Sequence, residues 1–270
     1  MNARARRALL VLVVTTVVVL GAVWLLDKVW NSTKKTLTSD GCSVTGYDVD
    51  TGQAAVASTM VGEVTRTGLP ERAAVLVLAA GLQESKLRNL PSGAGDRDSV
   101  GVLQQRPSQG WGTVAQLSDV HFATKAFLDA LVKVDAWQTR PLAQAIQEVQ
   151  VSADASAYAV HEQEAQALAD ALSGREPAGI TCTFGTPSQV APVATVAADL
   201  AADLPVNPPA ASGFTVSVPG AHWQTAAWFV ANADRLGIDA VGYSGKEWTR
   251  SGGWQDGSAG ASAVVATLHH

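Results

Sequence analysis

Glu84 is the side chain in this 270-residue sequence whose type and surroundings best suit catalysis. It follows the apolar stretch 73–82 and is followed at once by Ser85, within the segment AAGLQESKLR. Breaking a glycosidic bond needs a proton on the leaving oxygen, yet a free glutamic acid with a pKa of about 4.3 is mostly ionised at neutral pH. The negative end of a helix and a partly desolvated cleft both raise that pKa. A glutamate near the end of an amphipathic helix is usually a solvated charge, so the prediction that Glu84 is a catalytic acid and base depends on the motifs around it.

Polar and aromatic residues near Glu84 are candidates for binding a sugar. Ser85, Gln104 and Gln105 are expected to hydrogen-bond Glu84 and an N-acetyl sugar, as small polar groups in a cleft commonly do. Tyr158 either donates its hydroxyl to this site or is an ordinary half-buried helix tyrosine. Trp111 either stacks on a sugar ring or anchors its loop in the core, and the core interpretation is favoured.

Asp96 and Asp98 are the candidates for a second carboxylate. An inverting hydrolase needs one about 6.5 to 9.5 Å from the acid, so that a water fits between them. Turn chemistry alone explains aspartates in such a Gly- and Asp-rich loop, which makes a catalytic role the weaker interpretation. The stretch DRDSVG also begins like a calcium-binding EF-hand loop, but Pro107 occupies the position where that loop needs glutamate. No metal and no cofactor are expected.

Two motifs, Glu84-Ser85 and Gly101-Val102-Leu103-Gln104, resemble those of the lytic transglycosylases and goose-type lysozymes of the lysozyme-like superfamily. The family's third motif, of Ala-Tyr-Asn type, is represented by Ala157-Tyr158-Ala159, which lacks the asparagine. The run QQRPSQGWG is similar to one in actinobacterial secreted or anchored proteins. The resemblance covers about residues 55–172 and implies cleavage of peptidoglycan glycan strands. In such families the single glutamate also takes the proton from the sugar's own 6-hydroxyl, which yields a 1,6-anhydro product and needs no second carboxylate.

The N-terminus predicts a membrane protein. Residues 8–26 form a run of 19 residues without a charge, preceded by Arg4, Arg6 and Arg7. This length suits one bilayer crossing, and the basic flank places the N-terminus in the cytoplasm and the bulk of the chain outside the cell membrane. A cleaved signal peptide is the alternative. Outside a reducing cytosol, Cys42 and Cys182 are expected to form a disulfide. The net charge of −5 offers no basic patch for nucleic acid.

Apolar periodicity divides the chain into four parts. Residues 1–40 are assigned to the cytoplasmic stub, membrane anchor and spacer, and residues 41–184 to a mainly α lysozyme-like catalytic domain. Its helices are expected at 53–67, 71–90, 122–134, 141–149 and 153–172, and strand signals are nearly absent. Residues 185–215 contain five prolines and are predicted to form an extended linker. Residues 216–270 are predicted to form a small α+β module of unknown role, with a helix at 221–236 and strands at 238–243 and 263–268.

The sequence thus predicts a membrane-anchored enzyme that cleaves peptidoglycan, more readily as a transglycosylase than as a hydrolase. The C-terminal module offers a surface through which a protein complex could dock. The rival hypothesis, prompted by the missing asparagine after Tyr158, is a catalytically inactive peptidoglycan-binding or scaffold protein of a conjugation, secretion or wall-remodelling complex.

Overall fold

A three-stranded antiparallel sheet opens the part of the chain that the computed structural model describes, residues 40–152 and 155–270. The strands lie in the order β2-β1-β3. They are β1 (Gly41–Val44), β2 (Tyr47–Val49) and β3 (Ile180–Thr183). Cys42 lies directly opposite Cys182, and the two form the expected disulfide. Because this bridge joins residues 140 positions apart, it stabilises the fold by about 4 to 5 kcal/mol in the chain-entropy description.

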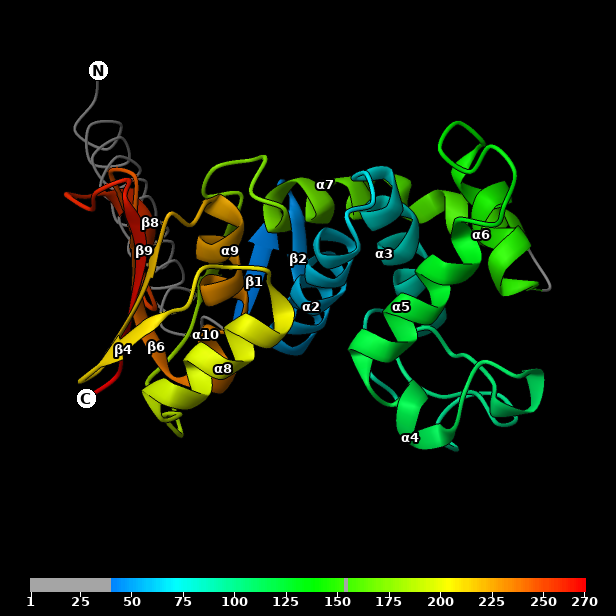
Figure 1. The fold of residues 1–270 in the computed structure, drawn as a ribbon, viewed down its shortest axis with the longest axis horizontal. Helices are drawn as coiled ribbons and strands as arrows, with labels where there is room; N and C mark the ends of the chain where they lie inside the picture. The colour runs from blue at the N-terminus through cyan, green and yellow to red at the C-terminus, as the bar shows by residue number, and fades with distance from the viewer. Residues whose placement is uncertain (1–39, 153–154) are drawn as a thin grey trace, which may run out of the picture. The chain divides into compact units, whose positions relative to one another are not determined.

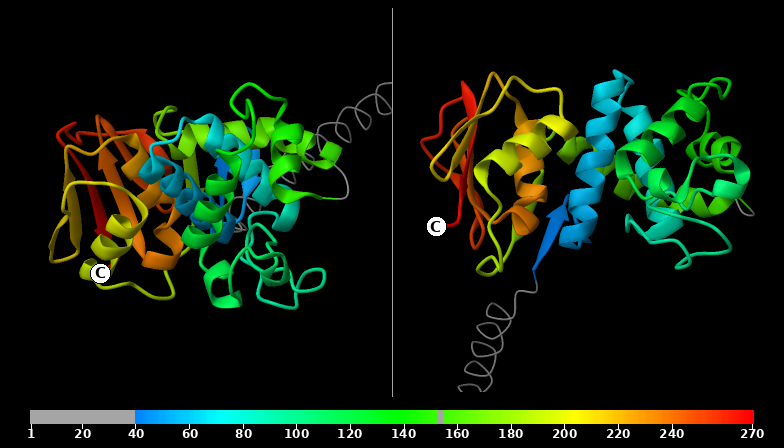
Figure 2. Two further views of the ribbon diagram at one scale, coloured as in Figure 1. Left: turned by 45° about the vertical axis from the view of Figure 1, so that its right-hand side comes forward. Right: turned by 60° about the horizontal axis from the view of Figure 1, so that its bottom comes forward.

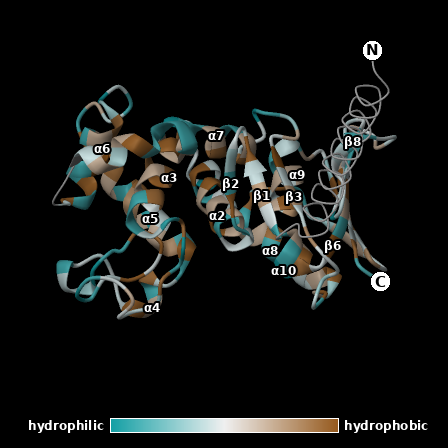
Figure 3. Cartoon of the chain, turned by 180° about the vertical axis from the view of Figure 1, so that it is seen from behind, coloured by the Kyte–Doolittle hydropathy of each residue, from teal (hydrophilic) through white to brown (hydrophobic). Residues whose placement is uncertain are grey.

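Helix α3 is the centre of the helical region (Figure 1). Every residue from Ala73 to Leu82 is buried, and a helix that is apolar on all sides must be surrounded by other elements. It contacts α2, α5, α6, α7 and the 3-10 helix η2. The helical elements before β3 are α2 (Thr51–Thr67), α3 (Arg72–Ser85), η1 (Pro107–Gln109), α4 (Val114–Leu117), α5 (Val120–Leu131), α6 (Leu142–Gln150), η2 (Ala155–His161) and α7 (Glu162–Leu172). Hydrophilic and hydrophobic residues alternate along the outer helices α6 and α7, which bury one face each (Figure 3).

The end of α3 determines where Glu84 lies. The sequence suggests a helix over residues 71–90, but α3 ends at Ser85 because Lys86 and Leu87 both adopt left-handed backbone conformations, with φ of 55° and 56°. The Leu87 N–H donates back to the Gly81 carbonyl at 2.9 Å, and the Leu87 side chain is fully buried. A Cβ on Gly81 would lie 2.9 Å from that side chain. Leu87 therefore turns the chain inward at the second residue after the helix.

A six-stranded antiparallel sheet forms the C-terminal part, in the order β4-β5-β9-β6-β7-β8 (Figures 1 and 2). Its strands are β4 (Ala210–Ser212), β5 (Thr215–Pro219), β6 (Ile238–Tyr243), β7 (Lys246–Thr249), β8 (Gly253–Asp256) and β9 (Ala263–Leu268). The accompanying helices are α8 (Val193–Asp203), α9 (Trp223–Ala231) and α10 (Ala233–Leu236). Strands β6 and β9 lie where the sequence predicts them.

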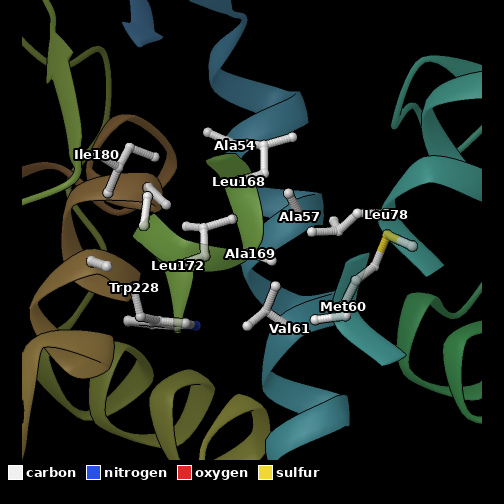
Figure 4. Packing of buried hydrophobic residues seen from close by; sticks show 14 of the residues in the cluster. Ala54, Ala57, Met60, Val61, Leu78, Leu168, Ala169, Leu172, Ile180 and Trp228 are labelled. Carbon is white, nitrogen blue, oxygen red and sulfur yellow. The ribbon is translucent and has the colours of Figure 1, made fainter. Parts of the chain in front are cut away.

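Helix α9 joins the sheet to the helical region. It contacts β6 and β9 on one side and α2, α7 and β3 on the other. Trp228 of α9 is buried near Val61 of α2 and Leu172 of α7 (Figure 4). The hydrophobic cluster to which they belong includes residues of both sheets. The indole N–H groups of Trp248 and Trp254 donate to carbonyls of β3, at Cys182 and Ile180. Residues 40–270 consequently cluster as one compact unit.

The mainly α fold class is wrong. Of the residues that the structure describes, 44% are helical and 19% are in strands, and the two antiparallel sheets make the fold mixed α and β. The sequence underestimates strands because β1, β2 and β3 have only three or four residues each, too few for a clear alternation of apolar and polar residues.

The segment expected to be an extended linker contains regular structure. Residues 185–215 include helix α8 and strand β4. Val196, Leu200 and Leu204 recur at helical spacing and are buried, while Pro192 stands at the helix N-cap, where a missing N–H costs nothing. The prolines of this segment lie outside α8 and therefore do not prevent the helix.

The predicted cell-membrane localisation is also corrected. Across residues 40–152 and 155–270, the structure contains no helix of the length and apolar character that a bilayer crossing demands. The run 8–26, on which the single-pass topology depended, lies outside the described residues.

Candidate functional site

A cleft of about 710 Å³ lies beside the end of α3. Glu84 stands on one wall, and the loop between α3 and η1 supplies most of the other. The C-terminal end of α6 closes a third side through Gln150, Val151 and Ser152. The cleft is thus formed by three segments that are separate in sequence, and all three lie within residues 84–152.

Glu84 is half-buried and is held by two donors. The Tyr158 hydroxyl donates a hydrogen bond of 2.6 Å to Glu84 Oε1. Gln150 also hydrogen-bonds the Glu84 carboxylate, and its Nε2 donates to the Leu103 carbonyl at 3.0 Å. Tyr158 lies on η2 and is fully buried. Helices α3, α6 and η2 therefore fix the position of one carboxyl group.

Burial raises the pKa of Glu84 above its ordinary value. The hydrogen bonds from Tyr158 and Gln150 oppose this effect, since they stabilise the ionised form, but they do not cancel it. The pKa of the Tyr158 phenol is raised too, by burial first and then by its bond to Glu84. Tyr158 therefore remains a neutral hydroxyl donor while Glu84 changes its protonation state.

Gly101 and Gln104 form a tight turn opposite Glu84. The Gly101 N–H donates to the Leu90 carbonyl at 2.8 Å, and the amide of Gln104 donates to the Gly101 carbonyl at 2.9 Å. Gly101 has φ of 78°, and a Cβ there would lie 2.2 Å from the Leu117 carbonyl oxygen. Glycine is therefore required at this position. Gln104 lines the cleft, as expected for a residue that binds substrate.

Gln105 lines the cleft and has a buried side-chain carbonyl without a partner in the described part of the chain. Its side chain is 2% exposed and lines the cleft wall. The amide nitrogen donates to the Ala123 carbonyl at 3.2 Å, whereas Oε1 has no hydrogen-bond partner among the residues that the structure describes. A buried carbonyl without a partner costs free energy.

Ser85 lies behind the cleft and does not line it. Its hydroxyl donates to the Val102 carbonyl at 2.7 Å and accepts from the Arg88 N–H at 3.1 Å. Ser85 thus connects the end of α3 to the turn that carries Gln104. This position supports an indirect role, in which Ser85 orients the two walls relative to each other.

Neither candidate second carboxylate is free for catalysis. Asp98 does not line the cleft, and it accepts hydrogen bonds from the backbone N–H and the hydroxyl of Ser108, which lower its pKa. Asp96 lines the cleft, but it pairs with Arg106 at 2.8 Å and with Arg97 at 3.7 Å. The described lining residues include two carboxyl groups: Asp96 is paired with arginine, and Glu84 is bonded to the hydroxyl of a buried tyrosine.

Trp111 anchors its loop against the core, and stacking on a sugar ring stays a prediction. It is partly buried against the hydrophobic core, and it also lines the cleft. An indole in this position offers an apolar surface on which a sugar ring can stack.

Gln150, Arg97 and Arg106 are cleft residues that the sequence did not single out. Arg97 and Arg106 lie next to the motif residues in the sequence. Their positive charge within a polar loop is the feature that could have identified them as cleft residues. Gln150 gave no such signal, because a glutamine near the end of an amphipathic helix is usually a solvated residue.

A second cluster of titratable groups lies away from the cleft. His121 of α5 contacts Glu63 of α2 at 3.3 Å and Asp203 of α8 at 2.9 Å. Asp203 also accepts from the Thr59 hydroxyl at 2.9 Å and from the Trp228 indole at 2.6 Å. No group of three or more metal-ligating side chains with a suitable arrangement occurs in residues 40–152 and 155–270. This cluster joins α2, α5, α8 and α9.

Comparison with known proteins adds no family assignment: no family model matches the chain, and no curated protein is significantly similar to it.

Proposed function

We propose that this protein cleaves the glycan strands of peptidoglycan with Glu84 as its single acid and base. The observation that carries the proposal is the position of Glu84: a half-buried carboxyl with a raised pKa, bonded to a buried tyrosine, on the wall of a cleft large enough for sugar rings. The resemblance of Glu84-Ser85 and Gly101–Gln104 to lytic transglycosylase motifs supplies the substrate class.

The first step is protonation of the glycosidic oxygen. Protonated Glu84 gives its proton to the leaving oxygen as the bond from that oxygen to C1 breaks. The carboxylate that forms retains the hydrogen bonds from Tyr158 and Gln150, which favour the ionised state. The same two donors therefore stabilise the charge that develops during bond cleavage.

The second step uses the substrate's own hydroxyl. Glu84 takes the proton from the 6-hydroxyl, O6 bonds to C1, and the product is a 1,6-anhydro sugar. The engagement of Asp98 with Ser108 and of Asp96 with Arg106 favours this route over a hydrolysis that needs a second carboxylate.

Substrate positioning is assigned to the wall opposite Glu84. Gln104 and Gln105 line this wall, and we assign them to hydrogen bonds with an N-acetyl sugar. Trp111 offers a stacking surface in the same cleft.

The test is to incubate the full chain with purified peptidoglycan and to analyse the soluble products by mass spectrometry. We expect muropeptides with 1,6-anhydro ends from the unaltered protein and at least about a thousandfold less from Glu84→Gln. The control is Glu148→Gln, which replaces an exposed glutamate of α6 outside the cleft and should leave the product yield unchanged.

The possible outcomes distinguish three functions. Reducing-end products that depend on Glu84 would identify a hydrolase and contradict the one-carboxylate route. Binding of peptidoglycan without any product would leave the non-catalytic binding protein as the function and would reject the proposal.

A further inference from the structure

The cleft carries more positive than negative charge on the wall opposite Glu84. Arg97 and Arg106 both line it, and Asp96 is the one acidic residue of that wall among the described lining residues. The chain as a whole has a net charge of −5, whereas this wall of the cleft has two positively charged guanidinium groups. Such a local excess of cation favours an acidic group on the ligand.

Arg106 is held in place by the protein. Its side chain is 17% exposed, its Nη2 donates to Asp96 at 2.8 Å, and its Nε donates to the Ser99 hydroxyl at 3.3 Å. Arg106 therefore neutralises most of the charge of Asp96. Arg106 shapes the wall and orients Asp96, and has few donors left for a ligand.

Arg97 is the available cation. Its side chain is 73% exposed, and the one ion pair that it makes within the described residues, Nε to Asp96 at 3.7 Å, is longer than a hydrogen bond. An exposed pair of this kind contributes little stability and is easily replaced by another anion. The planar guanidinium of Arg97 keeps its terminal nitrogens for a bidentate bond to a carboxylate.

We infer that Arg97 binds a carboxylate carried by the glycan strand, so that the preferred substrate is a strand with acidic substituents. This inference rests on the proposed function for its substrate class. A carboxylate on a lactyl group or on a peptide attached to the sugar would pair with Arg97 while the sugar ring lies between Trp111 and Glu84. Neutral glycan chains would lack this contact.

The experiment compares two forms of the same peptidoglycan: untreated, and treated with carbodiimide and an amine so that its carboxylates become neutral amides. Binding of the full chain is measured by co-sedimentation in a Glu84→Gln background, which prevents cleavage, and cleavage is measured separately with Glu84 intact. We expect the dissociation constant for the amidated form to be about tenfold higher, as befits one charge-assisted bidentate contact.

Arg97→Gln should abolish the difference between the two forms, and Arg97→Lys should restore part of it. Arg88→Gln is the matched control, because Arg88 is also an exposed arginine with one carboxylate partner, Asp50 at 3.0 Å, but does not line the cleft. It should keep the full difference. Thermal unfolding of each variant checks that the fold is unchanged.

Equal binding of the two forms by the unaltered site, or a preference that survives in Arg97→Gln, would overturn the inference. A failure of this inference can be distinguished from a failure of the proposed function. Cleavage of both forms at equal rates would reject the role of Arg97 and retain the enzyme, whereas Arg97-dependent binding without cleavage would retain the carboxylate site and reject the enzyme.

Discussion

The fold buries two carboxyl groups, those of Glu84 and Asp203, and the net change in pKa has opposite directions in the two. Burial raises the pKa of both groups. For Asp203 the bonds from His121, Trp228 and Thr59 outweigh burial, and the net result is a lowered pKa. For Glu84 the bonds from Tyr158 and Gln150 are not enough, and the pKa stays raised.

The difference separates a structural carboxylate from a reactive one. Asp203 is 6% exposed and lies among four elements that depend on its charge, so it is stable as an anion. Glu84 faces a cleft with its desolvation only partly compensated, so it can hold a proton and deliver it. A buried carboxyl group is therefore a candidate for acid–base catalysis only where its hydrogen bonds are too few to offset the effect of burial on its pKa.

The largest expected effect follows from removing Asp203. Asp203→Ala leaves the Trp228 indole and His121 without their acceptor, and breaking a buried charged pair costs about 3 to 5 kcal/mol. We expect a loss of this size in the free energy of unfolding, measured by chemical denaturation.

Asp199→Ala is the control for that loss. Asp199 lies one turn earlier on α8 and pairs with Arg235 at 2.7 Å at a partly exposed site, where an ion pair contributes at most about 1 kcal/mol. Equal losses in the two variants would show that Asp203 has no special structural role.

A smaller effect, on activity, is expected at Tyr158. Tyr158→Phe removes the donor to Glu84 Oε1 and should lower the cleavage rate about ten- to a hundredfold, the range for one hydrogen bond to a charged group. Because this bond lowers the pKa of Glu84, its removal should move the alkaline decline of the rate to higher pH. Tyr243→Phe, in β6 and outside the cleft, should change neither the rate nor the pH profile.

The smallest expected effect is the pH dependence of stability that comes from His121. Its hydrogen bond with Asp203 raises the pKa of His121, and burial opposes this. A raised histidine pKa stabilises the fold fully below the ordinary value of about 6.5, and that contribution disappears as pH rises through the folded-state pKa. We expect the free energy of unfolding to fall from pH 6 to pH 9 by on the order of 1 kcal/mol, given the partial exposure of His121.

His121→Gln should remove this part of the slope, and His222→Gln, which replaces an exposed histidine, should not. The lowered pKa of Asp203 affects stability at acidic pH. Its contribution to the free energy of unfolding is present above about pH 3.9 and is lost as pH falls through the folded-state pKa. An unchanged slope in His121→Gln would show that the pair does not respond to pH as described.

Local patterns explain what the sequence revealed of the fold. Helices α2, α5, α6 and α9 follow from apolar periodicity, and β6 and β9 from short alternating runs. The early end of α3 was missed because Leu87 is apolar and continues the helical pattern, although its side chain turns back under the helix. The three-stranded sheet was missed because pairing between β1 and β3 depends on residues far apart in the chain.

The same limit applies to the candidate site. Glu84, Gln104 and Tyr158 were recognisable from motifs, and the structure brings Glu84 and Tyr158 into contact. The role of Asp203 was hidden, since Thr59 and His121 are 144 and 82 residues away from it. Its segment also resembled a proline-rich linker. Hydrogen-bond partners from distant parts of the chain determine whether the burial of a carboxyl group is offset. The local sequence does not reveal these partners.

The most direct measurement is the titration of both carboxyl groups by carbon-13 NMR, with Glu84→Gln and Asp203→Asn used to assign the signals. Glu84 should titrate above the ordinary glutamate pKa of about 4.3, and Asp203 below the ordinary aspartate pKa of about 3.9. A Glu84 signal that titrates at or below 4.3, as in an exposed or fully compensated carboxylate, would contradict its assignment as the proton donor.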